Sequence, residues 1–156
     1  SVVVDRANRA LCRHTPLDRF VTFFYGVVDT DARTLHYTNA GHNLPILVRA
    51  DGSVVRLATG GLVLGVAGDA RYAQDSVALQ SGDRLVLFTD GITEAEGRSV
   101  DDFSGDEFGD DRLVDTVVAL RGESPWRMVD AIVNRVTDHT GGLFRDDATL
   151  LALAIR

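Results

Sequence analysis

The apolar segment at residues 148–155, ATLLALAI, constrains the fold more than any other part of the chain. It is too short to cross a bilayer, and a nearly unbroken apolar run of this length is typical of a central strand covered on both faces. A second apolar segment, residues 84–89, lies far from it in the sequence. We therefore predict that strands from distant parts of the chain share one hydrophobic core.

The middle of the chain is rich in β-branched and aromatic residues separated by turn signals. These segments predict strands at residues 20–28, 34–39, 46–49 and 54–58, which we interpret as an antiparallel meander. A glycine-rich connection then leads to a further predicted strand at residues 72–79. The residues between 79 and 84 read QSGD and predict a hairpin corner that leads into the strand 84–89.

Three segments have helical spacing of apolar residues. The first covers residues 2–13 and is closed by Pro16. The second begins near Asp110 or Asp111, either of which is a good N-cap, and ends near Gly122. The third has Ser124 as cap and Pro125 at its first position, and it ends before two glycines. Its predicted apolar face consists of Trp126, Val129, Ile132, Val133 and Val136.

The bulk composition excludes several classes of protein. The chain has 156 residues, 45% of them hydrophobic, so we expect one domain over residues 1–156. The net charge is −7 and the 16 basic residues are scattered arginines, which argues against a nucleic-acid partner. The chain shows no leader and no membrane span, so we expect a cytoplasmic protein without a membrane partner. The single cysteine, Cys12, excludes an internal disulfide and a cysteine zinc cluster.

Carboxylates stand at the ends of the two most apolar strands. Asp90 follows the strand 84–89, and Asp146 and Asp147 precede the last strand. If these strands are antiparallel neighbours, the carboxylates lie at one edge of the sheet, where they repel each other unless a cation lies between them. Carboxylates without histidine or thiolate partners favour Mg²⁺ or Mn²⁺. The alternative is that Asp90 caps a turn and the other two are solvated.

Several motifs, in their order and approximate spacing, resemble the SpoIIE-type (RsbU-like) serine/threonine phosphatases of the protein phosphatase 2C-like metal-dependent class. They read FVTFFYGVVD, YTNAGHNLP, GGLVLGV, GDRLVLFTDGITEA, FGDDRL and RDDATLLAL. The resemblance implies an α+β fold, an α-β-β-α sandwich of two antiparallel sheets flanked by helices. It also implies that Asp90 and Asp146 ligate two Mn²⁺ or Mg²⁺ ions, with Asp147 as the next candidate, and that a metal-bound water hydrolyses the phosphate ester.

The usual substrate in this family is a phosphoserine or phosphothreonine on an anti-sigma-factor antagonist, a small STAS-domain protein. Relatives commonly carry upstream PAS or GAF sensor domains, and a homodimer is compatible with the sequence. The family also has an earlier GDVSGHG-like segment, whose aspartate bridges both metals, and nothing in residues 1–19 matches it. The chain is therefore interpreted either as the larger, C-terminal part of the domain or as a degenerate pseudophosphatase that acts as an interaction module.

Other residues are candidates for supporting roles. Thr89 and Thr93 flank Asp90 and are candidates to orient it, and Gly91 allows a tight turn after it. Asn39 is expected to hydrogen-bond the backbone of the loop that contains His42, which either has a structural role or contacts the substrate. The acidic segment 101–111 lacks the ligand pattern of an EF-hand, so we predict a solvated flap followed by helix-capping acids.

Overall fold

The computed structural model describes residues 2–14, 16, 19–97 and 105–156. These residues form helices and mostly antiparallel sheets, which confirms the predicted α+β class. The chain divides into two compact units. Unit 1 comprises Ser1–Leu44 and Leu57–Leu79, and unit 2 comprises Pro45–Arg56 and Gln80–Arg156.

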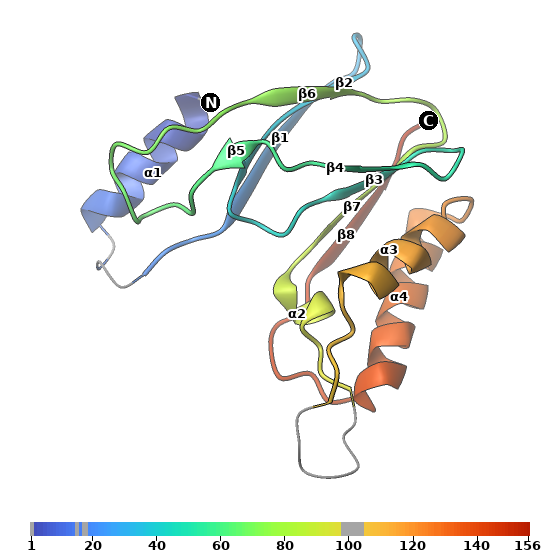
Figure 1. Ribbon diagram of the computed structural model, residues 1–156. Helices are drawn as coiled ribbons and strands as arrows, with labels where there is room; N and C mark the ends of the chain where they lie inside the picture. The colour runs from blue at the N-terminus through green and yellow to red at the C-terminus, as the bar shows by residue number, and fades with distance from the viewer. Residues whose placement is uncertain (1, 15, 17–18, 98–104) are drawn as a thin grey trace. The chain divides into compact units, whose positions relative to one another are not determined.

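The part of unit 1 that the structure describes forms one helix and one four-stranded sheet (Figure 1). Its elements are α1 (Val2–His14), β1 (Phe23–Asp29), β2 (Thr34–Ala40), β5 (Gly60–Gly61) and β6 (Asp75–Ala78). β2 pairs antiparallel with β1 and β6 and parallel with β5. Glycine is required at position 60, because a Cβ there would lie 1.6 Å from the Asn39 carbonyl oxygen of β2.

Helix α1 is held in unit 1 by an apolar cluster and by one buried amide. Val4 is fully buried together with Ala40, Leu64 and Tyr72. Asn8 is also fully buried, and its side chain donates to the Ala67 carbonyl at 2.7 Å and accepts from the Gly65 N–H at 2.9 Å. A buried amide that makes both kinds of hydrogen bond loses little on leaving water. The predicted helix at residues 2–13 is thus confirmed.

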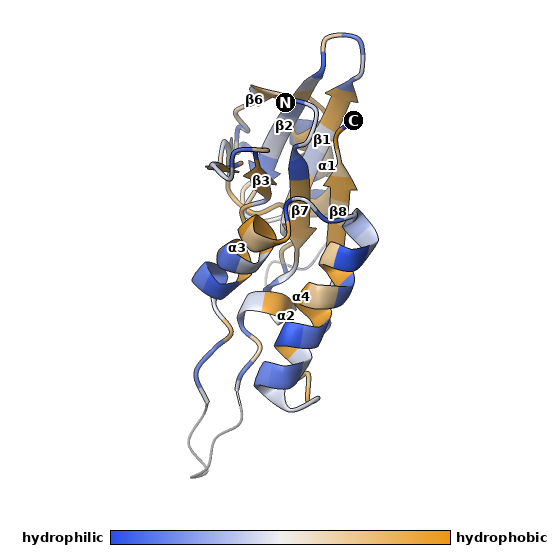
Figure 2. Ribbon diagram, turned by 90° about the vertical axis from the view of Figure 1, so that its right-hand side faces the viewer, coloured by the Kyte–Doolittle hydropathy of each residue, from blue (hydrophilic) through white to orange (hydrophobic). Residues whose placement is uncertain are grey.

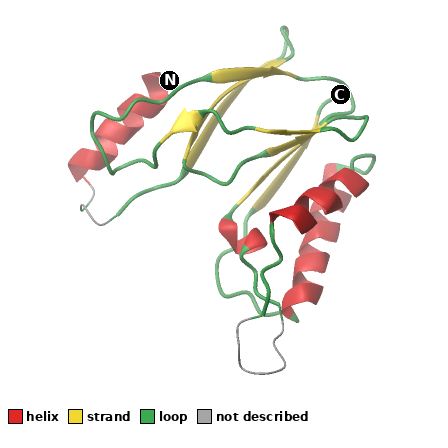
Figure 3. Ribbon diagram, viewed as in Figure 1, coloured by secondary structure: helices red, strands yellow, loops and turns green. Residues whose placement is uncertain are grey.

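The described residues of unit 2 form a second four-stranded sheet and three helices (Figure 3). The strands β3 (Ile46–Val48), β4 (Val54–Arg56), β7 (Arg84–Phe88) and β8 (Leu150–Ala154) lie in the order β4-β3-β7-β8, and all pairs are antiparallel. The helices are α2 (Asp90–Thr93), α3 (Asp110–Ala119) and α4 (Pro125–Thr140). α3 and α4 pack against this sheet through one apolar core that includes Val86, Phe88, Val117, Met128 and Ile132.

The ends of α4 agree with the prediction. The Ser124 side chain accepts from the Arg127 N–H, Pro125 is the first helical residue, and Gly141 ends the helix in a left-handed conformation. Hydrophobic and hydrophilic residues occupy different sides of α4 (Figure 2). The predicted apolar face was wrong at two positions, because Trp126 is 75% and Val133 is 39% exposed, and Met128, which was not predicted, is buried.

The acidic residues before α3 form ion pairs within unit 2. Both side-chain oxygens of Asp110 accept from Arg56 of β4, at 2.7 and 2.8 Å. Asp106 pairs with Arg112, and this hydrogen bond and charge lower the pKa of Asp106 below its usual value. The N-cap of α3 is Gly109 rather than an aspartate, so the predicted capping position was wrong by one residue. Residues 101–104 of the predicted flap lie outside the described residues.

Three further predictions about the strands were wrong. The meander is divided between two sheets, because β3 pairs with β7 and not with β2. The turn before β7 is not a hairpin corner, since β6 and β7 belong to different sheets. β8 is not central, because it ends the strand order, and its Leu151 and Leu153 are exposed.

A buried ion pair explains the shape of the turn before β7. Asp83 is buried, accepts from Arg49 at 2.5 Å and accepts from the Gln80 N–H at 2.9 Å. The backbone of the turn also pairs with Ile155, which follows β8. The turn residues are therefore bonded to residues that directly follow β3 and β8, the two strands that flank β7.

Candidate active site

The register of β7 and β8 places the predicted carboxylates at one edge of the unit 2 sheet. Phe88 lies opposite Leu150, and the two strands are antiparallel. Asp90 follows β7 by two positions and Asp146 precedes β8 by four. The condition on which the sequence argument depended, that these strands are antiparallel neighbours, is thus confirmed.

Thr89 connects the chain after β7 to the chain before β8. Its hydroxyl donates to the Asp147 carbonyl at 3.1 Å and accepts from the Thr149 N–H at 2.9 Å. Its own N–H donates to the Thr149 carbonyl at 3.1 Å. Thr89 therefore extends the strand pairing up to the residue before Asp90. Thr93 makes a longer contact of 3.4 Å to the Asp90 carbonyl.

Gly91 allows the two carboxylate-bearing segments to approach closely. A Cβ at this position would lie 2.6 Å from the Asp147 carbonyl oxygen and 2.9 Å from its carbonyl carbon. Both are backbone atoms, which cannot move aside as the end of a flexible side chain can. The glycine after Asp90 is thus needed for contact with the backbone at Asp147.

The three carboxylates are exposed, and two make similar local hydrogen bonds. Asp90 Oδ1 accepts from the Gly91 N–H at 3.0 Å, and Asp146 Oδ1 accepts from the Asp147 N–H at 2.7 Å. Among the described residues, no group donates to Oδ2 of either side chain. A carboxylate oxygen that faces water without a protein partner is a suitable ligand for a hard cation.

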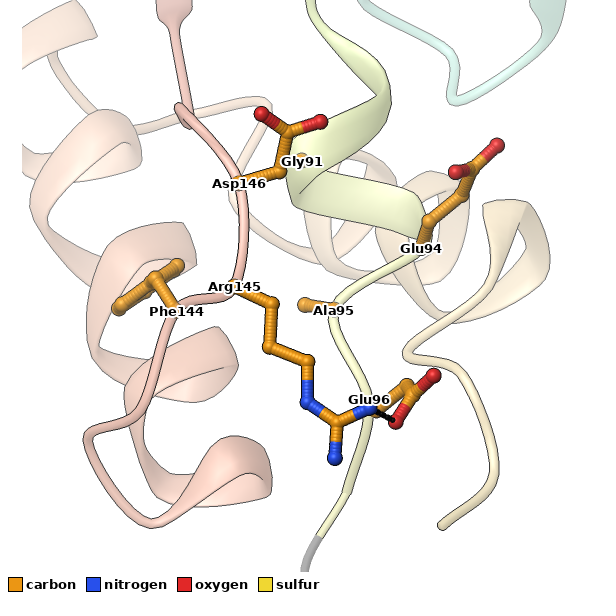
Figure 4. A pocket seen from close by; sticks show the side chains of 7 residues that line it. All are labelled: Gly91, Glu94, Ala95, Glu96, Phe144, Arg145 and Asp146. Carbon is orange, nitrogen blue, oxygen red and sulfur yellow. Dashed lines mark ion pairs between the residues drawn. The ribbon is translucent and has the colours of Figure 1, made fainter. Parts of the chain in front are cut away.

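A pocket of about 190 Å³ adjoins Asp146 (Figure 4). Its lining residues are Gly91, Glu94, Ala95, Glu96, Phe144, Arg145 and Asp146. Arg145 forms an ion pair with Glu96, and its side chain extends away from the Asp146 carboxylate. The pocket thus combines three carboxylates with one guanidinium group.

A larger and more apolar cavity of about 530 Å³ also reaches Asp146 and Asp147. The rest of its lining comes from α2, α4 and the segment around the start of β8, namely Ile92, Val129, Val133, Phe144, Ala148 and Leu150. Asp146 therefore borders a charged pocket and an apolar one.

The donor chemistry of this edge suits Mg²⁺ or Mn²⁺, because every candidate ligand is a carboxylate. Within residues 2–14, 16, 19–97 and 105–156, however, no three His, Cys, Asp or Glu side chains form a group that could hold a metal ion. The described residues fit as part of a metal site, with Asp90, Asp146 and Asp147 as its candidate ligands.

Asn39 and His42, the other predicted residues, belong to unit 1. The Asn39 side chain accepts from the His42 N–H at 2.7 Å and donates to the His42 and Leu57 carbonyls at 3.0 and 3.3 Å. The prediction that Asn39 hydrogen-bonds the loop backbone is confirmed. His42 Nδ1 lies 3.3 Å from the Thr22 hydroxyl. A role for His42 in substrate contact stays a prediction.

Sequence reasoning missed Glu94, Glu96 and Arg145. Arg145 directly precedes Asp146, and the two glutamates follow Asp90 within the motif TDGITEAE. Their charge next to the candidate ligands was the available signal. Their convergence on one pocket depends on the pairing of β7 with β8, which the sequence does not display.

The two sheets, their helices and the carboxylates at the β7–β8 edge define a protein of the phosphatase 2C-like fold class. The chain superposes on the phosphatase domain of the cell fate determinant SpoIIE from Bacillus subtilis, in a manganese-presoaked structure, with a TM-score of 0.71. The match covers 99% of this chain and 64% of that chain at 19% identity. The SpoIIE domain is itself described as a PP2C phosphatase domain.

The sequence comparison identifies the family within this class. The family model for stage II sporulation protein E (SpoIIE) matches residues 1–156, so the chain belongs to the SpoIIE family. It is 35% identical to the phosphoserine phosphatase RsbU of Bacillus subtilis over 95 residues, which is 60% of this chain and 28% of RsbU. It is 29% identical to protein IcfG of Synechocystis over 141 residues, 90% of this chain and 21% of IcfG.

The chain thus spans less than a third of the length of either curated relative. Among the described residues, none of the helices is both long and apolar enough to span a membrane.

Proposed function

We propose that this chain is part of a metal-dependent protein phosphatase that hydrolyses phosphoserine or phosphothreonine. The observation that carries the proposal is the antiparallel pairing of β7 with β8, which brings Asp90 and Asp146 to one edge of the sheet. Membership of the SpoIIE family and the similarity to a phosphoserine phosphatase support this activity.

The cofactor in this proposal is a pair of Mn²⁺ or Mg²⁺ ions held in part by Asp90, Asp146 and Asp147. When bound, such ions acidify a coordinated water and offset the negative charge of the phosphoryl group. Hydrolysis adds the water oxygen to phosphorus and breaks the bond to the serine or threonine oxygen. That oxygen leaves as a hydroxyl after it takes a proton, and inorganic phosphate is the second product.

The other residues of the edge keep the carboxylates in place. Thr89 holds the backbone at Asp147 and Thr149 beside β7, and Gly91 permits the close approach of that backbone. Rigid placement of charged ligands reduces the reorganisation that substrate binding would otherwise require. In this proposal, Thr89 and Gly91 position the carboxylates and do not contact the phosphoryl group.

The proposed substrate is a phosphorylated anti-sigma-factor antagonist of the STAS type. This choice rests on the resemblance to RsbU-like phosphatases and on the similarity to RsbU itself. We propose further that an aspartate in polypeptide upstream of residue 1 completes the metal site, as the GDVSGHG-like segment does in the family. A sensor domain of the PAS or GAF type would precede that segment.

The second candidate is a pseudophosphatase that binds a partner without hydrolysis. One observation favours it, namely that the described residues contain no group of three metal-ligating side chains. The two candidates differ in metal binding, because only the phosphatase needs tightly held ions.

The test uses the full-length protein that contains this chain. Asp90→Asn should abolish Mn²⁺-dependent release of phosphate from a phosphorylated antagonist and weaken Mn²⁺ binding in calorimetry. The matched control is Asp115→Asn, since Asp115 is an exposed aspartate on α3. Full activity of the Asp90 variant would refute the assignment, and wild-type protein that binds no Mn²⁺ would favour the pseudophosphatase.

A further inference from the structure

We propose that Arg145 binds the phosphoryl group of the substrate, and inorganic phosphate after hydrolysis, and that Glu96 holds Arg145 when no anion is bound. The inference rests on the proposed function and extends it by assigning the anion-binding side chain of the site. It follows from the charges of the residues around the 190 Å³ pocket, from the exposure of Arg145 and from its ion pair with Glu96.

The composition of the pocket selects Arg145. Of the described residues that line it, Arg145 is the one cationic side chain, and Glu94, Glu96 and Asp146 are anionic. It is also the sequence neighbour of Asp146, and both residues line the same pocket, in which the Arg145 side chain now extends toward Glu96 (Figure 4). A phosphoryl dianion next to these carboxylates is repelled by their charge, and the positive charge of Arg145 offsets part of this repulsion.

The guanidinium group suits this role because of its geometry. Its N–H groups form a planar fork that donates two parallel hydrogen bonds to a phosphate. The Arg145 guanidinium now forms an ion pair with a single Glu96 oxygen, and the Arg145 side chain is 76% exposed, whereas that of Glu96 is 29% exposed. An ion pair with so exposed a partner contributes little to stability, so a dianion can replace Glu96 at low cost.

Other arginines of unit 2 show what a structural role looks like. Arg56 uses two nitrogens to bind both oxygens of Asp110. Arg49 is mostly buried and contacts the fully buried Asp83. Both are held at fixed positions in the fold. Arg145 differs from them because it is exposed and lines a pocket next to a candidate metal ligand.

The experiment measures the binding of inorganic phosphate to the full-length, Mn²⁺-loaded protein by calorimetry, together with KM and product inhibition. Arg145→Ala should weaken phosphate binding by about tenfold or more, since a hydrogen bond to a charged group is lost. The phosphate affinity of Arg145→Lys should lie between those of the wild type and Arg145→Ala, because lysine keeps the positive charge but lacks the planar pair of N–H donors. Glu96→Gln should tighten phosphate binding about two- to fivefold, because Arg145 is released.

The opposite directions of these two effects are the critical result. If the ion pair only clamped the fold, both Arg145→Ala and Glu96→Gln would weaken phosphate binding, and that outcome would overturn the proposal. Arg127 and Glu123 provide the matched control, since Glu123, two residues before α4, forms an ion pair with Arg127 in the first turn of the helix, and Arg127 is 75% exposed. Arg127→Ala and Glu123→Gln should leave phosphate binding unchanged.

Failure of the proposed function gives a different result. In that case neither the wild type nor any variant would release phosphate from the substrate. The affinity for inorganic phosphate would still differ between Arg145→Ala and Glu96→Gln. Equal phosphate binding by wild type and Arg145→Ala, with Mn²⁺ bound to both, would refute the role of Arg145 even in an active phosphatase.

Discussion

Gly91→Ala is the most direct perturbation of the candidate active site. The added methyl group would lie 2.6 Å from the Asp147 carbonyl oxygen, 2.9 Å from its carbon and 3.2 Å from the Ala148 nitrogen. These backbone atoms are held by the hydrogen bonds of Thr89. The contact must therefore be relieved by a shift of α2 or of the segment before β8.

The expected cost combines two opposing effects. Overpacking a tight contact costs about 1–3 kcal/mol. Alanine in place of a helical glycine recovers roughly 0.5–1 kcal/mol, so the net loss should lie between about 0 and 2.5 kcal/mol. Gly122→Ala is the control, because a Cβ there meets nothing within 4 Å and φ is not in the left-handed range. This control should gain about 0.4–1 kcal/mol through the unfolded state.

Urea denaturation of the full-length protein, followed by circular dichroism, measures both changes in the free energy of unfolding. The m-values of the two variants should agree, so that the midpoints report stability. Calorimetry should also show weaker Mn²⁺ binding for Gly91→Ala and none of this loss for Gly122→Ala. Equal unfolding free energies for the two variants would show that the backbone at Asp147 can move away from a methyl group. Glycine would then not be required at position 91.

Two further predictions concern a hydroxyl group and a carboxylate. Thr89→Val removes the side-chain partner of the Thr149 N–H and the Asp147 carbonyl. Because these groups are exposed and can bind water instead, the substitution should cost about 0.5–1.5 kcal/mol in urea denaturation, while Thr89→Ser should retain most of the stability. The pKa of Asp75 lies below its usual value of 3.8 because its carboxylate accepts hydrogen bonds, first from the Ser76 N–H and then from the Thr59 hydroxyl. Its contribution to stability is present above pH 3.8 and is lost as the pH falls through the lowered folded-state pKa, so wild type should lose its advantage over Asp75→Asn in acid. A stability difference that stays constant down to low pH would contradict this reasoning.

The sequence predicted those helices whose ends are determined by residues at the ends themselves. The cap at Ser124, the proline after it and the left-handed Gly141 mark both ends of α4 without reference to the rest of the fold. The partners of a strand are a tertiary property. The residues of a turn such as Gln80–Asp83 do not indicate whether the turn joins two neighbouring strands of one sheet or connects two different sheets. The apolar run of β8 likewise does not distinguish an edge strand from a central one.

The same distinction holds for the site. The position of Asp90 and Asp146 at one edge of the sheet was predictable because each stands beyond the end of an apolar strand, and the two strands are antiparallel neighbours. Their role as metal ligands stays a prediction. The ion pair of Glu96 with Arg145 was not predictable, because its members are far apart in sequence and neither lies in a strand with a periodic pattern. Asn39 was predictable because asparagine at a turn commonly bonds nearby backbone, as it does with His42.

The division of the chain into units limits how the protein can be dissected. Residues Pro45–Arg56 belong to unit 2 although unit 1 precedes and follows them, so the backbone passes from one unit to the other after Leu44, after Arg56 and after Leu79. A truncated polypeptide that starts at Gln80 would keep β7, β8 and all three helices of unit 2 but would leave one side of β7 without β3. An unpaired apolar strand of that kind promotes aggregation. Truncations intended to isolate the candidate active site must therefore retain the β3–β4 hairpin.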